Sequence, residues 1–96
     1  MKLAFNLNSA NGAVIAVVQI MQKPQGLVAV GEVINGSVSK GDTVGIQSGD
    51  KIAVYDQLKR IEIDHEEVLA AESGQLIGVC LTDTSKEGLL RYLDRN

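Results

Sequence analysis

The side chains of this protein that could do acid–base or metal chemistry gather around its single histidine. His65 follows Asp64 and precedes Glu66 and Glu67, and an imidazole beside carboxylates can act as a general base or bind a metal ion. Contiguous side chains on an extended or turning backbone point in different directions, and the sequence has no second histidine or suitably spaced cysteine to complete a tetrahedral site. The pattern therefore favours a solvated acidic loop; a small hydrolase or metal-dependent enzyme using Asp64, His65 and Glu67 is the alternative.

The single cysteine is the other side chain with nucleophilic potential. Cys80 stands between Val79 and Leu81, and it would need a neighbouring base to become a reactive thiolate. Buried cysteines that act as small hydrophobic residues are far commoner, so we expect Cys80 in the core. A lone cysteine forms no internal disulfide, and the N-terminus lacks the features of a secretion signal, so we expect a cytoplasmic protein. The apolar run at residues 13–20 is too short to cross a membrane.

The charge balance argues against a free-standing nucleic-acid binder. Nine Lys and Arg stand against twelve Asp and Glu, a formal net charge of −3, whereas nucleic-acid-binding domains carry a basic excess. A local patch for RNA phosphates would have to use Lys23, Lys40, Lys51, Lys59 and Arg60. The same segments carry the acidic residues Asp42, Asp50, Asp56, Glu62 and Asp64. Mixed charge is typical of an ordinary protein surface, so RNA binding is the weaker interpretation.

Regularly spaced glycines define the elements that would position these residues. Gly26, Gly31, Gly36 and Gly41 are separated mostly by β-branched or small apolar residues. Glycines at this spacing are unfavourable in a helix but suit strands joined by tight turns. The segment predicts a strand, turn and strand of a small barrel. No helix start follows the glycines, so they do not indicate a phosphate-binding loop.

Short apolar segments separated by turn signals predict further strands. The Asn11-Gly12 pair is expected to join residues 2–7 and residues 13–21 as a hairpin. The other predicted strands are residues 26–34, 44–47, 51–55, 57–64 and 75–81, while residues 65–72 are compatible with one helical turn. Thr84 followed by Glu87 has the spacing of a capping box, which predicts a short helix over residues 84–95.

These elements predict an all-β fold, a small closed antiparallel β-barrel of six to seven strands with a short C-terminal helix. We expect one domain over residues 1–96. Within it, residues 1–12 form an added N-terminal strand and turn, residues 13–82 form the barrel and residues 84–95 form the helix.

Two apolar surfaces of this fold need covering. The predicted strand at residues 13–21 is apolar on both faces, so either the closing helix or a second subunit must lie against its outer side. The helix carries an apolar stripe of Leu89, Leu90, Tyr92 and Leu93. This stripe would either dock a partner helix or cover the barrel's own open end, and the second use is the commoner one.

Residues 14–81 resemble a known family in the order and spacing of their glycines. The patterns are Gly26-x-Val28-x-x-Gly31-x-Val33, Gly36-x-x-x-x-Gly41-Asp42 and Ala71-x-x-Gly74-x-x-x-Gly78-x-x-Leu81. They are similar to patterns in the second domain of translational GTPases such as elongation factor Tu, which is a closed six-stranded barrel. The resemblance implies this barrel and a binding role rather than catalysis, because glycines and small apolar residues specify a fold more than an activity.

Three features depart from the family's pattern. The sequence has no Gly-x-x-x-x-Gly-Lys-Ser/Thr loop, so we expect neither nucleotide binding nor GTP hydrolysis. The family's acidic pair, which helps form the pocket for an aminoacyl-tRNA, aligns with the apolar Val17 and Val18. Helix-like residues 85–95 replace the family's last strand, and we hypothesise that residues 2–7 close the barrel against residues 13–21 instead.

The sequence thus predicts a non-catalytic binding module with no cofactor, metal, membrane or nucleotide partner. We expect a protein or ribonucleoprotein partner, or a second copy of the chain, while direct ribosome or RNA binding is the weaker expectation. The predicted partner surface consists of Lys51, Lys59, Arg60, Leu89, Tyr92 and Leu93. The alternatives from other classes are an enzyme at the His65 cluster and a self-assembling scaffold.

Overall fold

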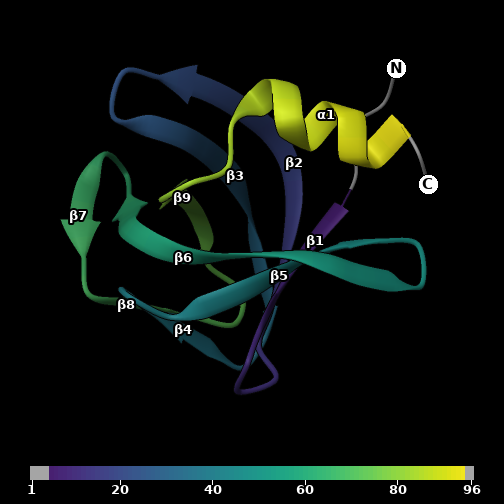
Figure 1. Ribbon diagram of the computed structural model, residues 1–96. Coiled ribbons are helices and arrows are strands. Elements are labelled where there is room, and N and C mark those ends of the chain that lie inside the picture. Colours follow the sequence, from purple (N-terminus) through teal and green to yellow (C-terminus); the bar gives the residue numbers. More distant parts are fainter. Residues whose placement is uncertain (1–4, 95–96) are drawn as a thin grey trace.

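Short strands make up most of the computed structural model, which describes residues 5–94 apart from the side chains of residues 48 and 51–53 (Figure 1). The strands are β1 (Phe5–Ser9), β2 (Val14–Lys23), β3 (Gly26–Asn35), β4 (Ser37–Ser39), β5 (Thr43–Ser48), β6 (Lys51–Ile63), β7 (Glu66–Val68), β8 (Ala70–Glu72) and β9 (Leu76–Leu81). One helix, α1 (Lys86–Asp94), follows them within the described residues. Residues 2–4 of the first predicted strand and residue 95 of the predicted helix lie outside the described part.

Six of the strands close into a barrel. Their order is β5-β1-β2-β3-β9-β6, and β6 pairs with β5 to complete the ring. Every pairing is antiparallel, so the predicted closed antiparallel barrel is confirmed. The first strand β1 lies between β2 and β5, where Leu7 stands opposite Ile15 on one side and Ile46 on the other. Strand β7 extends the sheet beyond β6, and β4 pairs separately with β8.

Alternating side chains fill the inside of the barrel, because successive residues of a strand point to opposite faces. Among the fully buried residues, Leu7, Ile15, Leu27, Ile46 and Leu58 are 0 % exposed and come from five different strands. The cluster continues through Ile61, Ile77 and Leu81 into one apolar core. No buried polar side-chain atom within residues 5–94 lacks a hydrogen-bond partner, and no helix there is long and apolar enough to cross a membrane.

The hairpin of β2 and β3 is bent by a bulge and by a close contact. Val17 pairs with Gly31 and Gln19 with Val30, so Val18 is an extra residue without a partner. The extra residue reverses the alternation, and Ile20 rather than Met21 then faces the core. Opposite the bulge, a Cβ atom added to Gly31 would lie 2.2 Å from the carbonyl oxygen of Ala16. Only glycine permits the two backbones to approach this closely.

Two predictions about the middle of the chain are wrong. Residues 51–55 and 57–64 are not separate strands but one strand, β6, because Asp56 stays in register opposite Val44 instead of starting a turn. Residues 65–72 contain no helical turn. Asp64 and His65, with φ angles of 52° and 68°, form a two-residue reversal that returns the chain as β7 along β6, and β8 follows.

Helix α1 lies across one end of the barrel (Figure 1). Its N-cap is Ser85 rather than the predicted Thr84, since the backbone N–H of Gly88 donates to Ser85 Oγ at 3.0 Å. Leu89 is buried, and Tyr92 and Leu93 pack against the core cluster. The apolar stripe of the helix therefore contacts the protein's own barrel.

The carboxylate of Asp56 fastens the segment between β9 and α1 to β6. It accepts hydrogen bonds from the backbone N–H groups of Thr82, Asp83 and Thr84, and from the Thr84 hydroxyl at 2.6 Å. Burial raises the pKa of Asp56, but the hydrogen bonds from Thr84, Gln57 and Asp83 outweigh burial, so the pKa lies below its ordinary value of 3.8. The folded protein therefore favours the ionised form of this side chain.

Gly31→Ala should lower the free energy of unfolding by about 3 kcal/mol or more, because the added methyl group would clash with the backbone of Ala16. Gly78→Ala is the matched control, since a Cβ there would meet only Val28 Cγ1, at 3.8 Å. Urea denaturation of the two variants measures the difference. Equal stability of the two variants would contradict the close contact.

Asp56→Asn should lower the free energy of unfolding near neutral pH by about 2–3 kcal/mol, because a charged acceptor of several hydrogen bonds is lost. The lowered pKa of Asp56 means that its stabilisation is present above the ordinary value of 3.8 and disappears as the pH falls through the folded-state value. Denaturation at pH values from about 7 down to about 2 should therefore show the two proteins converging in acid. Asp83→Asn is the control, as only its backbone N–H joins the network, and a pH-independent difference for Asp56→Asn would contradict the assignment.

Candidate binding groove

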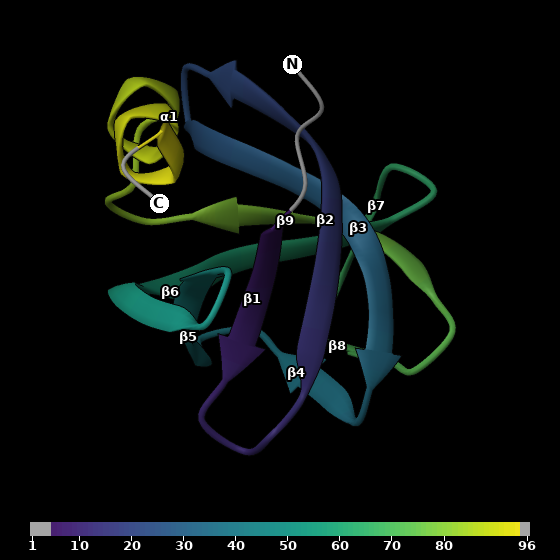
Figure 2. The ribbon, with the colours of Figure 1, turned by 90° about the vertical axis from the view of Figure 1, so that its right-hand side faces the viewer.

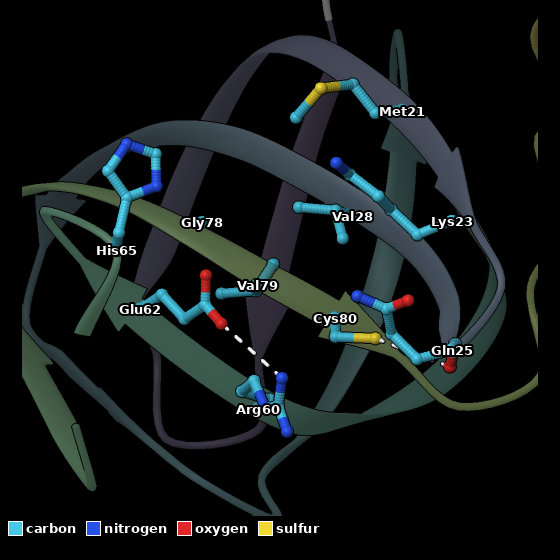
Figure 3. Close-up of a pocket in the computed structure, with 10 residues that line it drawn as sticks. All are labelled: Met21, Lys23, Gln25, Val28, Arg60, Glu62, His65, Gly78, Val79 and Cys80. Carbon is cyan, nitrogen blue, oxygen red and sulfur yellow. Dashed lines mark hydrogen bonds and ion pairs between the residues drawn. The ribbon is translucent and has the colours of Figure 1, made fainter. Parts of the chain in front are cut away.

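A groove of about 170 Å³ lies on the outer surface of the barrel over β2, β3, β9 and β6 (Figure 3). We call it the outer groove. Its lining residues are Met21, Lys23, Gln25, Val28, Arg60, Glu62, His65, Gly78, Val79 and Cys80. It combines an apolar floor with charged walls, and this combination is common in sites that bind other molecules.

Strand register brings the lining residues together from distant parts of the sequence. Cys80 stands opposite Val28 on β3 and opposite Arg60 on β6. Two residues along β9, Gly78 stands between Val30 and Glu62. Because Gly78 has no side chain, the floor is hollow at that point.

Ion pairs engage two of the cations in or beside the outer groove, Arg60 and Lys40. Arg60 Nη1 lies 3.5 Å from Glu62 Oε2, and Arg60 Nε lies 3.5 Å from Glu67 Oε1. Lys40 Nζ lies 3.3 Å from Glu67 Oε2. These pairs are exposed and contribute little stability, but they place carboxylates where an incoming phosphate would have to approach.

The structure gathers part of the predicted basic patch. A second depression, of about 410 Å³, adjoins the outer groove and is lined by Lys40, Lys59, Arg60 and Glu67, with Gln25 and Cys80. Lys59 Nζ donates to the carbonyl oxygen of Gln25 at 3.2 Å. Lys51 starts β6, about 26 Å along an extended strand from Lys59, and its side chain is outside the described part. The helix residues Leu89, Tyr92 and Leu93 cover the barrel's end, away from both depressions.

His65 and Cys80 take separate places in the outer groove (Figure 3). His65 is exposed and belongs to the reversal between β6 and β7, whereas Cys80 is 5 % exposed. The Cys80 thiol lies 3.8 Å from the carbonyl oxygens of Gln25 and Leu81. Within residues 5–94, no three His, Cys, Asp or Glu side chains converge as metal ligands would. Glu67, which the enzyme alternative requires beside His65, is engaged by Lys40 and Arg60.

The outer groove was not predicted from the sequence. Cys80 was expected in the core, and it is indeed buried, but the side chains of its strand neighbours Val79 and Leu81 face the core while Cys80 lies in the groove. The alternation of residues 76–81 could have signalled an outward Cys80. The lining also depends on Met21 facing outward, which follows from the bulge at Val18.

The fold defines a class, the small closed six-stranded antiparallel barrel, and this member has a groove on its outside. No family model matches the chain. Over 71 residues it is 32% identical to the selenocysteine-specific elongation factor of Mus musculus, a match covering 74% of this chain and 12% of that protein. Over 66 residues it is 36% identical to elongation factor 1-alpha of Natronomonas pharaonis, covering 69% of this chain and 15% of that protein. The chain thus spans only a small part of the length of these relatives.

The similarity and the barrel together confirm the predicted resemblance. The matched region is most of the chain, and the six-stranded closed ring is the architecture that the glycine patterns predicted. The protein is a translation-factor-like β-barrel of the kind found in the second domain of elongation factor Tu.

His65→Gly should raise the free energy of unfolding by about 0.5–1 kcal/mol, because His65 has a positive φ of 68° that glycine adopts without strain. Glu66→Gly, at the first residue of β7, is the control and should destabilise the protein by a similar amount. Thermal unfolding of both variants measures the effect. Destabilisation by His65→Gly would show that the imidazole makes a stabilising interaction that outweighs the backbone strain.

Proposed function

We propose that this barrel is a non-catalytic binding module whose outer groove docks a protein partner. The observation that carries the proposal is the groove itself, in which an apolar floor of Val28 and Gly78 lies between charges of both signs. Protein surfaces offer the apolar anchor and the mixed charges that such a groove matches. The similarity to part of two elongation factors supports a translation-factor-like domain, for which a binding role is plausible.

A ribonucleoprotein partner is the second candidate. The depression lined by Lys40, Lys59 and Arg60 favours it, because these cations lie together on one side of the outer groove. Against it, the carboxylates of Glu62 and Glu67 lie 3.3–3.5 Å from two of these cations. A protein partner therefore fits the local charges better than a phosphate backbone does. The lone buried Cys80 and the elongation-factor similarity support a cytoplasmic place of action for either partner.

Gly78→Leu should weaken partner binding, because the new side chain would fill the hollow floor of the groove while the backbone at Gly78 has ordinary geometry and space for a Cβ. Immobilised protein would be exposed to extract of its native cell, and retained proteins would be compared by mass spectrometry. We expect the amount of the specific partner that is retained to be at least about tenfold lower with Gly78→Leu, which corresponds to a loss of binding free energy of about 1.4 kcal/mol or more.

Leu69→Ser is the matched control, because Leu69 is 75% exposed and does not line the groove. Nuclease treatment separates the two candidates: retention that survives it indicates a protein, and retention that it removes, together with strong salt dependence, indicates a ribonucleoprotein. Identical retained proteins on the native chain and on folded Gly78→Leu would refute the groove as the binding site.

A further inference from the structure

The outer face of β2, β3 and β9 exposes apolar side chains that nothing in the described chain covers. Val18 is 65% exposed, Leu76 is 64% exposed and Ile34 is 51% exposed. Helix α1, the intramolecular candidate for covering β2, lies at the end of the barrel beside this face rather than over it (Figure 2). Contiguous exposed apolar surface of this kind marks an interaction site.

Strand register shows that the apolar residues form one surface. Met21 stands opposite Val28, and Val30 stands between Gln19 and Gly78. The next outward row joins Ala16, Glu32 and Leu76. We call this surface the apolar strip and define it by Ala16, Val18, Met21, Val28, Val30 and Leu76; the exposed Gln19 is a polar residue at its β2 edge.

Opposite charges stand at the two ends of the apolar strip. Lys23 pairs with Gly26 at one end, and Glu32 lies at the other. The seven residues from Gly26 to Glu32 span about 20 Å of extended strand. Both side chains are exposed, and neither makes an ion pair with another residue of the described part.

We propose that the apolar strip binds a second copy of this chain, face to face, with a two-fold axis running across the strands. This axis lays the Lys23 end of each copy over the Glu32 end of the other, so that both charges gain opposite partners. A two-fold axis along the strands would instead bring the two Glu32 ends together and the two Lys23 ends together. The charge pattern therefore selects one of the two face-to-face arrangements.

The size of the apolar strip sets the strength of the dimer. Three strands about 4.8 Å apart and about 20 Å long give the strip a flat area of about 300 Å² on each copy. The uneven surface of the side chains adds to this area. Stable dimers bury about 1,200 Å² or more in total. The dimer is accordingly weak, with a dissociation constant between about 10 μM and 1 mM.

Sedimentation of the purified chain from about 10 μM to about 1 mM tests the proposal. We expect a concentration-dependent shift from monomer to dimer. Val18→Asp should raise the dissociation constant at least about tenfold, a loss of about 1.4 kcal/mol, and should leave the monomer folded because Val18 is an exposed bulge residue. Leu69→Asp is the control, as Leu69 is also apolar and exposed but lies outside the strip, on the link between β7 and β8.

A charge exchange tests the orientation. Lys23→Glu and Glu32→Lys should each weaken the dimer, and the double variant should restore it to within about threefold of the native value, or about 0.7 kcal/mol. The proposal is overturned if the chain stays monomeric at about 1 mM or if Val18→Asp does not affect the dimer. Either result would mean that the strip does not bind a second copy of the chain. A double variant no tighter than its single parents overturns the two-fold arrangement. Because only the purified chain is used, these outcomes are independent of the partner sought at the outer groove.

Discussion

Closure of the ring of backbone hydrogen bonds is the constraint on which the rest of this structure depends. A barrel of six strands must bend its strands sharply. In this protein β2 and β3 bend at an unpaired residue, Val18, which lies next to the pair formed by Val17 and Gly31. The bulge keeps Ile15, Val17 and Ile20 on the core side although their spacing is irregular. The same bulge turns Val18 and Met21 outward. The apolar outer surface is thus a consequence of how the barrel closes.

The long strand β6 adds a charged wall to the outer groove of that closed ring. It pairs with β5 near its start and with β9 and β7 near its end, so Arg60 and Glu62 lie beside the floor formed by Cys80 and Gly78. Midway along it, Asp56 holds the segment leading into α1 through charge-assisted hydrogen bonds. That attachment directs the helix to the barrel's end, where Leu89 is buried. The faces of β2, β3 and β9 therefore stay open.

Much of the fold could be predicted from local sequence signals. The glycine spacing at Gly26 to Gly41 and the Asn11-Gly12 turn are direct consequences of backbone geometry, and the barrel they predicted is confirmed. The reversal at Asp64 and His65 was missed because neither residue is glycine, although both adopt positive φ. The groove could not be predicted, since the ion pairs beside it join residues as far apart as Lys40 and Glu67 and its floor depends on strand register. Periodicity constrains which side of a strand a residue faces but not which strand lies next to it.

The outer groove and the apolar strip are not independent surfaces. Met21 and Val28 belong to both, and Lys23 lines the groove while ending the strip. A second copy lying over the strip would cover one wall of the groove, so a partner in the groove and a second copy must exclude each other. A ligand that binds only the monomer shifts the monomer–dimer equilibrium toward the monomer, and a weak dimer then dissociates. A dimer of high affinity would instead keep the groove blocked. The small size of the strip and its single pair of end charges keep the dimer weak enough for the groove to remain available.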